Sequence, residues 1–233
     1  MRKSIFVVEG QTEQIFVQKF IEKMVTLKDC RVELGSLRHG DLKIFRNNGI
    51  SFDQASYCVR IINVGNDDKV NSFIDENLQN FQDKGFEIIY GLRDGYTGDK
   101  KKLPIDTDKI DKYFEPLATA KNLTLDVIIA VEEIEAWFLS VPSFFSSYDH
   151  SLTPDRVNEI LNVDLSTTAV ESLPHPSHLI NKVLSTVRQC YKKRQADSHK
   201  IANALDYGSL YLEKTNLIPA LKRFVRGIDN ALA

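Results

Sequence analysis

The sequence predicts an α/β fold in which a mostly parallel sheet is flanked by helices and is followed by a C-terminal helical subdomain. Up to about residue 135, short apolar runs alternate with segments that repeat apolar residues at helical spacing. Such alternation is typical of a parallel sheet with helices on both faces. After about residue 151 only the helical spacing remains. The 233 residues, of which 42% are hydrophobic, suit a core domain over residues 1–150 and a smaller helical one over residues 151–233.

The first part of the chain has four segments with the pattern of strands. They cover residues 4–8, 57–64, 86–92 and 125–131. Residues 31–45 are ambiguous, and we expect one short strand there and an irregular loop around His39. Helices are expected between the strands, with apolar stripes that begin at Phe16, Val70 and Ile110, and a further helix begins in "EAWFL". Thr12 is expected to cap the first of these helices.

The C-terminal part has only helical patterns. Thr153 followed by Pro154 is typical of a helix start, because proline is favoured at the first helical position. Apolar residues then recur at helical spacing over residues 179–187 and again over residues 217–228. We therefore expect helices and no strand in this region.

The composition favours a cytoplasmic protein. The formal net charge is −2, so any binding of nucleic acid would have to come from a local basic patch. The three cysteines lie far apart, which is typical of reduced thiols. No signal peptide follows the charged first residues, and no apolar stretch approaches the roughly 18 residues of a membrane span. We expect no membrane partner, and the oligomeric state stays open, with a homo-oligomer among the alternatives.

Carboxylates follow three of the expected strands. Glu9 ends the first strand, Asp94 ends "FEIIYGLR", and Glu132, Glu133 and Glu135 follow "LDVIIAV". Because ligands of open α/β sheets bind at the carboxyl ends of the strands, we expect these acids to converge at one edge. Carboxylates held together repel unless a cation lies between them, and oxygen ligands alone suit Mg²⁺ or Mn²⁺. Each acid by itself is also compatible with a polar strand exit or a favourable position near a helix N-terminus.

The stretch "VVEGQTE", residues 7–13, resembles the first motif of Toprim domains, which are the metal-dependent catalytic domains of topoisomerases, DnaG-type primases and OLD-family nucleases. In that family a glutamate and a glycine follow the first strand, as Glu9 and Gly10 do. A later strand ends in Asp-x-Asp, whereas "GLRDGYTGD" offers Asp94 and then Asp99 at a longer distance. Leu92 stands where the first aspartate would fall if Asp94 were the second, so the second motif is incomplete.

A group of bacterial Toprim-like proteins resembles the chain more fully. Its members share "VEGxTE", an Arg-Asp after a strand and "ExEAWF", which residues 133–138 match. They also have a helical C-terminal region with a Tyr-Lys element, matched loosely by residues 191–193. Relatives are linked to phage defence, often beside an ATPase of the OLD or ABC type. The resemblance implies a Toprim-like fold and a metal-dependent nuclease, with DNA or RNA as substrate and such an ATPase as a partner.

The expected site combines the acids with this resemblance. Catalysis is assigned to Glu9, Asp94 and Glu133. The expected ligands of Mg²⁺ or Mn²⁺ are Glu9, Asp94, Asp99, Glu133 and Glu135. Contacts to the phosphates of a nucleic acid are expected from Lys100, Lys101, Lys102, Lys192 and Lys193. In a continuous helix Glu132 would share a face with Glu135, whereas Glu133 joins Glu135 if it lies in the strand-to-helix turn, as the resemblance favours.

A second hypothesis assigns no chemistry to the chain. It would be a Toprim-derived interaction module that binds a partner ATPase, and the incomplete Asp-x-Asp motif favours this hypothesis. The retained Glu9 and the acids that follow the other strands favour the nuclease.

Three conspicuous side chains are expected to be structural. Trp137, the only tryptophan, is expected to anchor the packing between the sheet and the helical region and not to stack on a base. His175 and His178 have a spacing found in zinc sites, but no cysteine or carboxylate lies nearby in the sequence to complete a ligand set. We therefore expect a loop and a helix start at these histidines.

Overall fold

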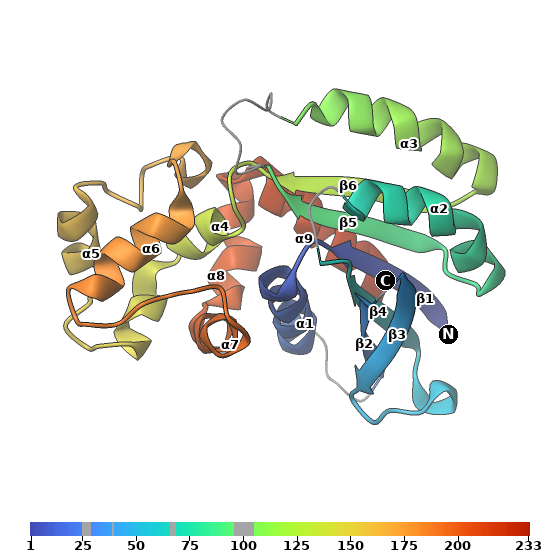
Figure 1. Ribbon diagram of the computed structural model, residues 1–233, viewed down its shortest axis with the longest axis horizontal. Helices are drawn as coiled ribbons and strands as arrows, with labels where there is room; N and C mark the ends of the chain where they lie inside the picture. Colours follow the sequence, from blue (N-terminus) through green and yellow to red (C-terminus); the bar gives the residue numbers. More distant parts are fainter. Residues whose placement is uncertain (25–28, 39, 66–68, 96–104) are drawn as a thin grey trace.

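The computed structural model of the chain describes residues 1–24, 29–38, 40–65, 69–95 and 105–233. Within these ranges the chain forms a sheet of six strands in the order β3-β2-β4-β1-β5-β6 (Figure 1). Neighbouring strands are parallel except β2 and β3, which are antiparallel. The strands are β1 (Arg2–Val8), β2 (Cys30–Arg38), β3 (Asp41–Asn47), β4 (Tyr57–Asn63), β5 (Ile88–Asp94) and β6 (Thr124–Ala130). The prediction of a mostly parallel sheet is confirmed.

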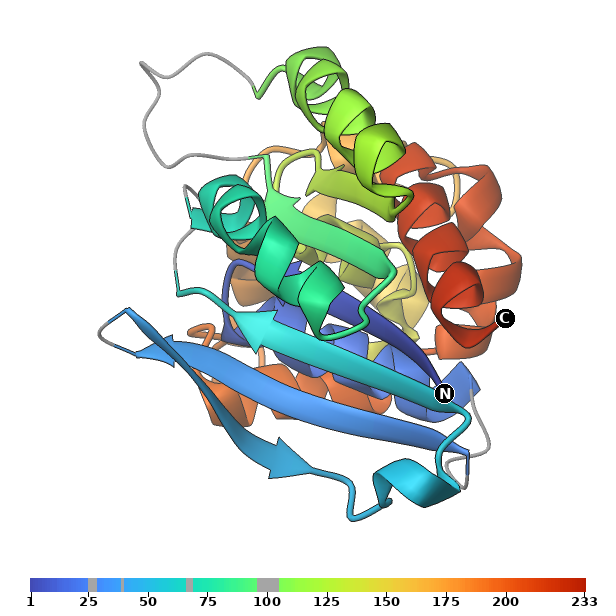
Figure 2. The ribbon, with the colours of Figure 1, turned by 90° about the vertical axis from the view of Figure 1, so that its right-hand side faces the viewer.

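Helices cover both faces of the sheet (Figure 2). Phe16 of α1 and Phe224 of α9 belong to the hydrophobic cluster on one face, and Ile74 of α2 and Phe114 of α3 belong to the cluster on the other. The helices are α1 (Gln11–Met24), α2 (Lys69–Asp83), α3 (Thr107–Lys121), α4 (Glu135–Leu139), α5 (Pro154–Leu161), α6 (Pro176–Ser185), α7 (Gln195–Ala204), α8 (Tyr207–Leu212) and α9 (Pro219–Leu232). The predicted flanking helices and the helical C-terminal region are confirmed.

β1 is the central strand of this arrangement because it pairs with β4 on one side and β5 on the other. Its side chains alternate between the two faces, as the pleat of a strand requires. Phe6 and Val8 enter the cluster beneath α1 and α9, and Ile5 and Val7 enter the cluster beneath α2 and α3. All four are fully buried, which explains the uninterrupted apolar run that precedes Glu9.

The C-terminal helices share one hydrophobic cluster with the sheet. The ring of Phe224 in α9 lies 6.3 Å from Phe6, 5.5 Å from Phe16, 5.2 Å from Phe20 and 5.7 Å from Trp137, measured between ring centroids. Trp137 is fully buried, so its predicted role as a packing anchor is confirmed. A domain boundary near residue 150 stays a prediction.

Two local expectations were wrong. One strand was expected within residues 31–45, but residues 31–38 and 41–45 lie in two antiparallel strands, β2 and β3; His39, around which a loop was expected, lies outside the described residues. The register of this pair shifts between Leu34 and Gly35, and such a bulge hides a strand because it breaks the alternation of apolar and polar residues. Thr12 does not precede α1 as a cap, since α1 begins at Gln11. By contrast, α5 begins at Pro154 as predicted, and Thr153 caps it by accepting a hydrogen bond from the Arg156 N–H.

The cysteines are free thiols, as expected from their spacing. Cys30 and Cys58 are buried, and Cys190 is exposed. Burial raises the pKa of the Cys30 thiol to about 12 and that of the Cys58 thiol to about 11. Among the described residues, no helix combines the length and the apolar character needed to cross a bilayer.

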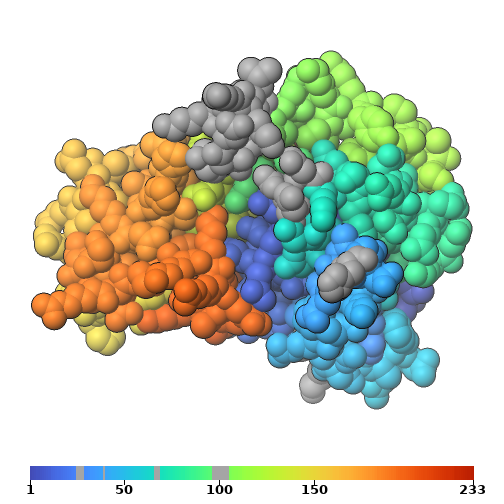
Figure 3. Space-filling model, in the orientation of Figure 1, coloured from blue at the N-terminus to red at the C-terminus, as the bar shows by residue number. Residues whose placement is uncertain are grey.

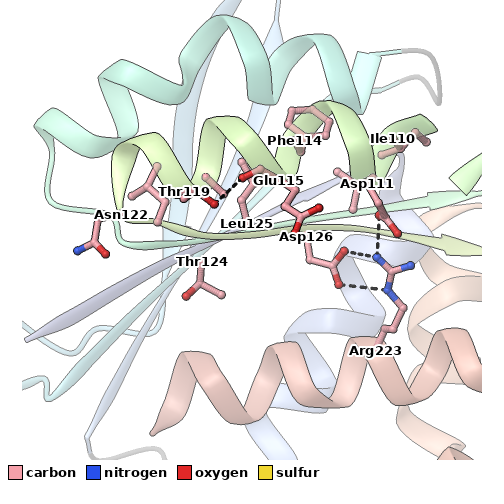
Figure 4. Close-up of a pocket in the computed structure, with 13 residues that line it drawn as sticks. Ile110, Asp111, Phe114, Glu115, Thr119, Asn122, Thr124, Leu125, Asp126 and Arg223 are labelled. Atoms are coloured by element: carbon pink, nitrogen blue, oxygen red, sulfur yellow. Dashed lines mark hydrogen bonds and ion pairs between the residues drawn. The ribbon is translucent and has the colours of Figure 1, made fainter. Parts of the chain in front are cut away.

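Arg223 of α9 ties three elements together at the β6 edge of the sheet (Figure 4). Its Nη2 donates to Oδ1 of Asp111 in α3 at 3.0 Å, and its Nε donates to Oδ2 of Asp126 in β6 at 3.2 Å. A cavity of about 610 Å³ lies beside these ion pairs, between α3, β6 and α9. Its lining includes none of the acids expected in the metal site.

Phe224→Ala is expected to destabilise the sheet and the C-terminal helices together. Truncation of a buried phenylalanine costs about 3–5 kcal/mol, and Phe224 packs against both regions. The fluorescence of Trp137 and the far-ultraviolet circular dichroism should therefore change in one coincident thermal transition at a lower temperature than in the wild type. Leu212→Ala is the control, because Leu212 is 71% exposed and its truncation should cost less than about 0.5 kcal/mol. Two separate transitions would contradict this expectation.

Candidate metal centre

The carboxyl ends of β1, β5 and β6 meet at one edge of the sheet. β1 pairs with β5 at Val8 and Leu92, and β5 pairs with β6 at Asp94 and Ala130. The acids that end or follow these three strands are therefore spatial neighbours, as the sequence predicts. Together with Glu13 they form what we call the acid cluster, which consists of Glu9, Glu13, Asp94, Glu133 and Glu135.

Asp94, Glu133 and Glu135 form the centre of the acid cluster. Each offers one carboxylate oxygen, and the three oxygens lie within 4.8 Å of one another. The three residues are only 6%, 8% and 0% exposed. Glu135 is the first residue of α4 and Glu133 lies in the turn before it, so both reach the same point. Glu132 is not one of the three residues whose oxygens converge, so it is Glu133 and not Glu132 that shares this group with Glu135.

Glu9 lies against the backbone of Asp94. Its Oε2 accepts a hydrogen bond from the Asp94 N–H at 2.9 Å. Glu9 is half-buried and is not one of the three residues whose oxygens converge. Its charge still acts on the cluster: the pKa of Asp94 is raised well above its ordinary value by burial, by Glu13 and Glu135, and by Glu9.

Glu13 is a member of the cluster that the sequence analysis did not assign to the site. It lies in the first turn of α1 and is 4% exposed. Burial and the neighbouring charges of Glu135 and Glu9 raise its pKa to about 8. The signal that could have identified it is its spacing of four residues from Glu9 within "VEGQTE", because α1 begins directly after Gly10.

Two glycines allow the chain to approach itself closely around the acids. A Cβ atom on Gly10 would lie 2.9 Å from Oε2 of Glu13. A Cβ atom on Gly95 would lie 2.0 Å from the carbonyl oxygen of Val131, and the Gly95 N–H donates to the carbonyl of Ala130 at 2.5 Å. Glycine at position 95 therefore lets the segment after β5 lie against the segment after β6, next to Asp94.

Lys193 brings a positive charge into the acid cluster. Its Nζ lies 2.9 Å from Oε1 of Glu133, 3.1 Å from Oε2 of Glu135 and 3.8 Å from Oδ2 of Asp94. Burial alone would lower the pKa of the ammonium group, but the charges of Glu135, Asp94 and Glu133 outweigh burial and raise it. The side chain is 37% exposed, so the ammonium group reaches the acids from the surface of the protein.

The N-terminus of α6 holds Glu133 in place. The Ser177 N–H donates to Oε2 of Glu133 at 2.8 Å, and the Ser177 hydroxyl donates to Oε1 at 3.0 Å. Burial would raise the pKa of Glu133, but Lys193 and the bonds from Ser177 outweigh it and hold this pKa below its ordinary value. Lys193 and Ser177 therefore favour the ionised form of Glu133. His175 and Pro176 stand at the start of this helix, as predicted for the loop and helix start.

Tyr191 holds the carboxyl group of Glu135 in place. The Tyr191 hydroxyl donates to Oε1 of Glu135 at 2.6 Å and lies 3.5 Å from Oγ1 of Thr12. Thr12 is in turn 3.0 Å from the hydroxyl of Ser198 in α7. Burial raises the pKa of Glu135, against the effect of Lys193. A network of hydroxyl groups thus connects α1, α4 and α7 behind the cluster.

The donor atoms of the cluster fit a hard divalent cation. They are carboxylate oxygens, which Mg²⁺ and Mn²⁺ prefer. Oε2 of Glu135 is fully buried and has no hydrogen-bond donor among the described residues, although the Nζ of Lys193 lies 3.1 Å away as an ion-pair partner. Among the described residues, the ammonium group of Lys193 is paired with Asp94, Glu133 and Glu135. One positive charge cannot neutralise three carboxylates, so bound protons or a further cation must offset the remaining charge.

The remaining expected site residues either lie outside the described residues or differ in whether they contact the acids. Asp99, Lys100, Lys101 and Lys102 lie outside the described residues. Lys192 is exposed, and its backbone N–H donates to Oδ2 of Asp197 at 2.9 Å. Of the expected basic residues in the described ranges, only Lys193 contacts the acids.

Lys193→Met is expected to lower the stability of the metal-free protein. Methionine keeps a flexible side chain of similar length, but it removes the charge that three carboxylates share. Breaking a buried ion pair costs about 3–5 kcal/mol, and we expect about 2–4 kcal/mol in urea unfolding because the Lys193 side chain is 37% exposed. Lys192→Met is the control and should cost less than about 0.5 kcal/mol. Equal effects of the two substitutions would contradict the role given to Lys193.

The stability of the metal-free protein is expected to fall as the pH rises from about 5 to about 8. The folded chain keeps a proton on Glu13 up to a pKa of about 8, whereas the unfolded chain loses it near the ordinary value of 4.5. Unfolding in this window therefore releases a proton, and the free energy of unfolding falls by at most about 1.4 kcal/mol per pH unit for one such group. The raised pKa values of Asp94 and Glu135 act in the same direction.

Melting temperatures measured in EDTA across this range check the sign. Glu13→Gln removes the titrating group and should make the melting temperature less dependent on pH and higher at about pH 8. A melting temperature that rises over the window, or the same slope in the variant and the wild type, would contradict the assignment.

Comparison with known proteins gives one match. The model of a family described as a domain of unknown function, DUF4276, matches residues 8–217. No curated protein and no solved structure matches the chain. The matched residues include the whole acid cluster and also Ser177, Tyr191 and Lys193. Since the match covers more than half of the sequence, the chain belongs to the DUF4276 family.

Proposed function

We propose that the acid cluster binds Mg²⁺ or Mn²⁺ and that the protein is a metal-dependent phosphodiesterase, a Toprim-like nuclease. The observation that supports this most is the convergence of buried carboxylate oxygens from Asp94, Glu133 and Glu135 within 4.8 Å. Structural ion pairs do not need this excess of acids over bases, and burying unneutralised carboxylates is costly. A function that uses a divalent cation explains why the fold tolerates that cost.

The triad would hold the cation, with Glu9 at its border. The bonds from Ser177 favour the ionised form of Glu133, and the Oε2 of the fully buried Glu135 lies 3.1 Å from the Nζ of Lys193. Such a cation supplies Lewis-acid polarisation of a phosphoryl oxygen and lowers the pKa of a bound water. This chemistry is the one that the resemblance to Toprim domains implies.

Other groups of the chain would move protons and orient the substrate. Glu13 holds a proton near neutral pH, because burial and its acidic neighbours raise its pKa to about 8, and its carboxyl group would deliver that proton to a leaving oxygen. Glu9 is half-buried and carries the carboxylate that would accept a proton from an attacking water. The ammonium group of Lys193, which reaches the cluster from the surface, would bind a phosphate oxygen.

The rival hypothesis is a non-catalytic module that binds a partner ATPase. The incomplete Asp-x-Asp motif favours it, because Leu92, where the missing aspartate would fall, is 1% exposed and belongs to the hydrophobic core. The proposal also includes a role in phage defence, with DNA or RNA as the substrate. This part of the proposal rests on the resemblance to Toprim domains alone.

Glu135→Gln is expected to abolish the response to cations. At one hundred times its dissociation constant, a cation that binds only the folded protein stabilises it by about 2.7 kcal/mol, which corresponds to roughly 5–10 °C in melting temperature for a chain of this size. Mn²⁺ and Mg²⁺ should raise the melting temperature of the wild type and leave that of the variant unchanged. Glu171→Gln is the control for the loss of one glutamate charge, because Glu171 is half-buried, accepts a hydrogen bond from Trp137 and lies outside the triad, and this variant should keep the response.

The same three proteins test the reaction. With Mn²⁺ or Mg²⁺, the wild type and Glu171→Gln should cleave at least one of plasmid DNA, single-stranded DNA and transfer RNA, and Glu135→Gln should cleave none. Binding of the cation without cleavage, with or without an added ATPase of the OLD or ABC type, would favour the interaction module. No response of the wild type to either cation would overturn both the metal site and the proposed reaction.

A further inference from the structure

β3 presents an exposed aromatic and basic edge that the acid cluster does not explain. It is the outermost strand of the sheet and pairs only with β2. Phe45 is 54% exposed and belongs to neither hydrophobic cluster. Lys43 and Arg46 are also exposed, and neither is in an ion pair with any other residue of the described ranges. We call Lys43, Phe45 and Arg46 the β3 edge.

A bulge gives Phe45 its exposed position. Arg46 pairs with Leu34 and Ile44 pairs with Gly35, so Phe45 has no partner in the ladder. An extra residue of this kind leaves the regular pleat and turns its side chain out of the usual alternation. A large apolar ring held outside the packed faces of a strand is unfavourable in water and is therefore a candidate contact for a ligand.

The cations of the β3 edge face α1. Leu42 packs with the cluster beneath α2, so its neighbour Lys43 points to the opposite face of the sheet. After the bulge, Arg46 pairs with Leu34 of the α1 cluster and lines a small hollow with Gln18 of α1. Both charges thus lie on the side of the sheet that α1 covers.

Arg46 makes no ion pair with another described residue, although one acid lies near it. Glu22 of α1 lines the same hollow as Arg46, is bonded to Lys19 at 2.9 Å and accepts a bond from Gln18. The pKa of His199 in α7 is lowered by burial and by the nearby charges of Lys19 and Arg46, and Glu22 acts in the opposite direction. Because Glu22 already pairs with Lys19, Arg46 is available for a phosphate oxygen of a ligand.

α1 lies between the β3 edge and the acid cluster. α7 and α1 are in contact, and Figure 3 shows α7, α1 and the β2–β3 strands side by side on one face of the molecule. Thr12, which lies next to Glu13 in the first turn of α1, is 3.0 Å from Ser198 of α7. Residues 12–18 of α1 are buried, so α1 offers no exposed track between the β3 edge and the acids, and a ligand of the β3 edge binds there by the contacts of that edge alone.

We propose that the β3 edge binds a single-stranded nucleic acid, with a base stacked on Phe45 and phosphates on Lys43 and Arg46. The combination of an exposed ring with flanking cations is the pattern by which proteins hold single strands without sequence preference. A duplex keeps its bases stacked inside, so it offers no base to Phe45. The proposal rests on the proposed nuclease function and names its substrate as single-stranded.

The test is the binding of a fluorescent single-stranded DNA of mixed sequence, about 20 nucleotides long, by fluorescence anisotropy in EDTA, where no divalent cation can support cleavage. Lys43→Ala combined with Arg46→Ala should weaken binding at least about tenfold at low salt and reduce the slope of log K against log salt by about 1.4, since each phosphate contact contributes about 0.7 on single strands. Phe45→Ala should weaken binding by about 5-fold to 150-fold without changing that slope.

The control is Lys222→Ala combined with Arg226→Ala, which removes the same two charges from exposed positions of α9. It should bind like the wild type. All variants should melt within about 2 °C of the wild type, because their side chains are exposed. Single-stranded RNA and a DNA duplex of the same sequence complete the series, and the duplex should bind more weakly and should not respond to Phe45→Ala.

Three results would overturn the proposal: no binding by the wild type, equal loss in the α9 control, or a duplex bound as tightly as the single strand with no effect of Phe45→Ala. Cleavage by the wild type together with unaltered binding by the β3 variants would reject the β3 edge alone. If the β3 variants lose binding but the wild type shows neither a cation response nor cleavage, only the nuclease function is rejected.

Discussion

Repulsion among the five carboxyl groups of the acid cluster is the constraint on which the rest of the structure depends. The groups that offset this repulsion come from the C-terminal part of the chain. Lys193 contributes a full positive charge, the N-terminus of α6 contributes N–H and hydroxyl donors through Ser177, and Tyr191 donates to the most deeply buried acid, Glu135. Burial, together with the repulsion that these groups leave uncompensated, raises the pKa values of Glu13 and Asp94.

The aromatic cluster beneath the acids supplies the rigidity that this arrangement needs. α4 is only five residues long, and so short a helix has little stability of its own. Trp137 fixes it between Phe16 of α1 and Phe224 of α9 and donates to Glu171 at 3.2 Å. The direction of Glu135 is therefore set by apolar packing, which also explains why "EIEAWF" joins acids and large aromatic side chains in one motif.

Local patterns in the sequence were sufficient for most of the fold and for the location of the acids. Apolar periodicity identified strands and helices that the structure contains, and strand ends identified Glu9, Asp94 and the acids after β6. β3 was missed because the bulge at Phe45 breaks its alternation and because most of the strand is exposed. The contacts of Lys193 with Asp94 and of Tyr191 with Glu135 join residues that are far apart in the sequence, and no periodicity records such contacts. The burial of Glu13 likewise depends on how α1 packs.

The order in which the acid cluster receives its partners has a consequence for synthesis of the chain. The ribosome makes all five acids before Ser177, Tyr191 and Lys193, and N-terminal regions of a chain begin to fold while synthesis continues. A partly made chain that has already formed β1, β5 and β6 would carry its carboxylates with neither the ammonium group nor the helix N-terminus that offsets them. During that interval the acids must stay protonated, hydrated or bound to cations from the cell. The acid cluster can therefore be completed only after the C-terminal helices have been synthesised. This order makes the candidate metal centre one of the last parts of the molecule to form.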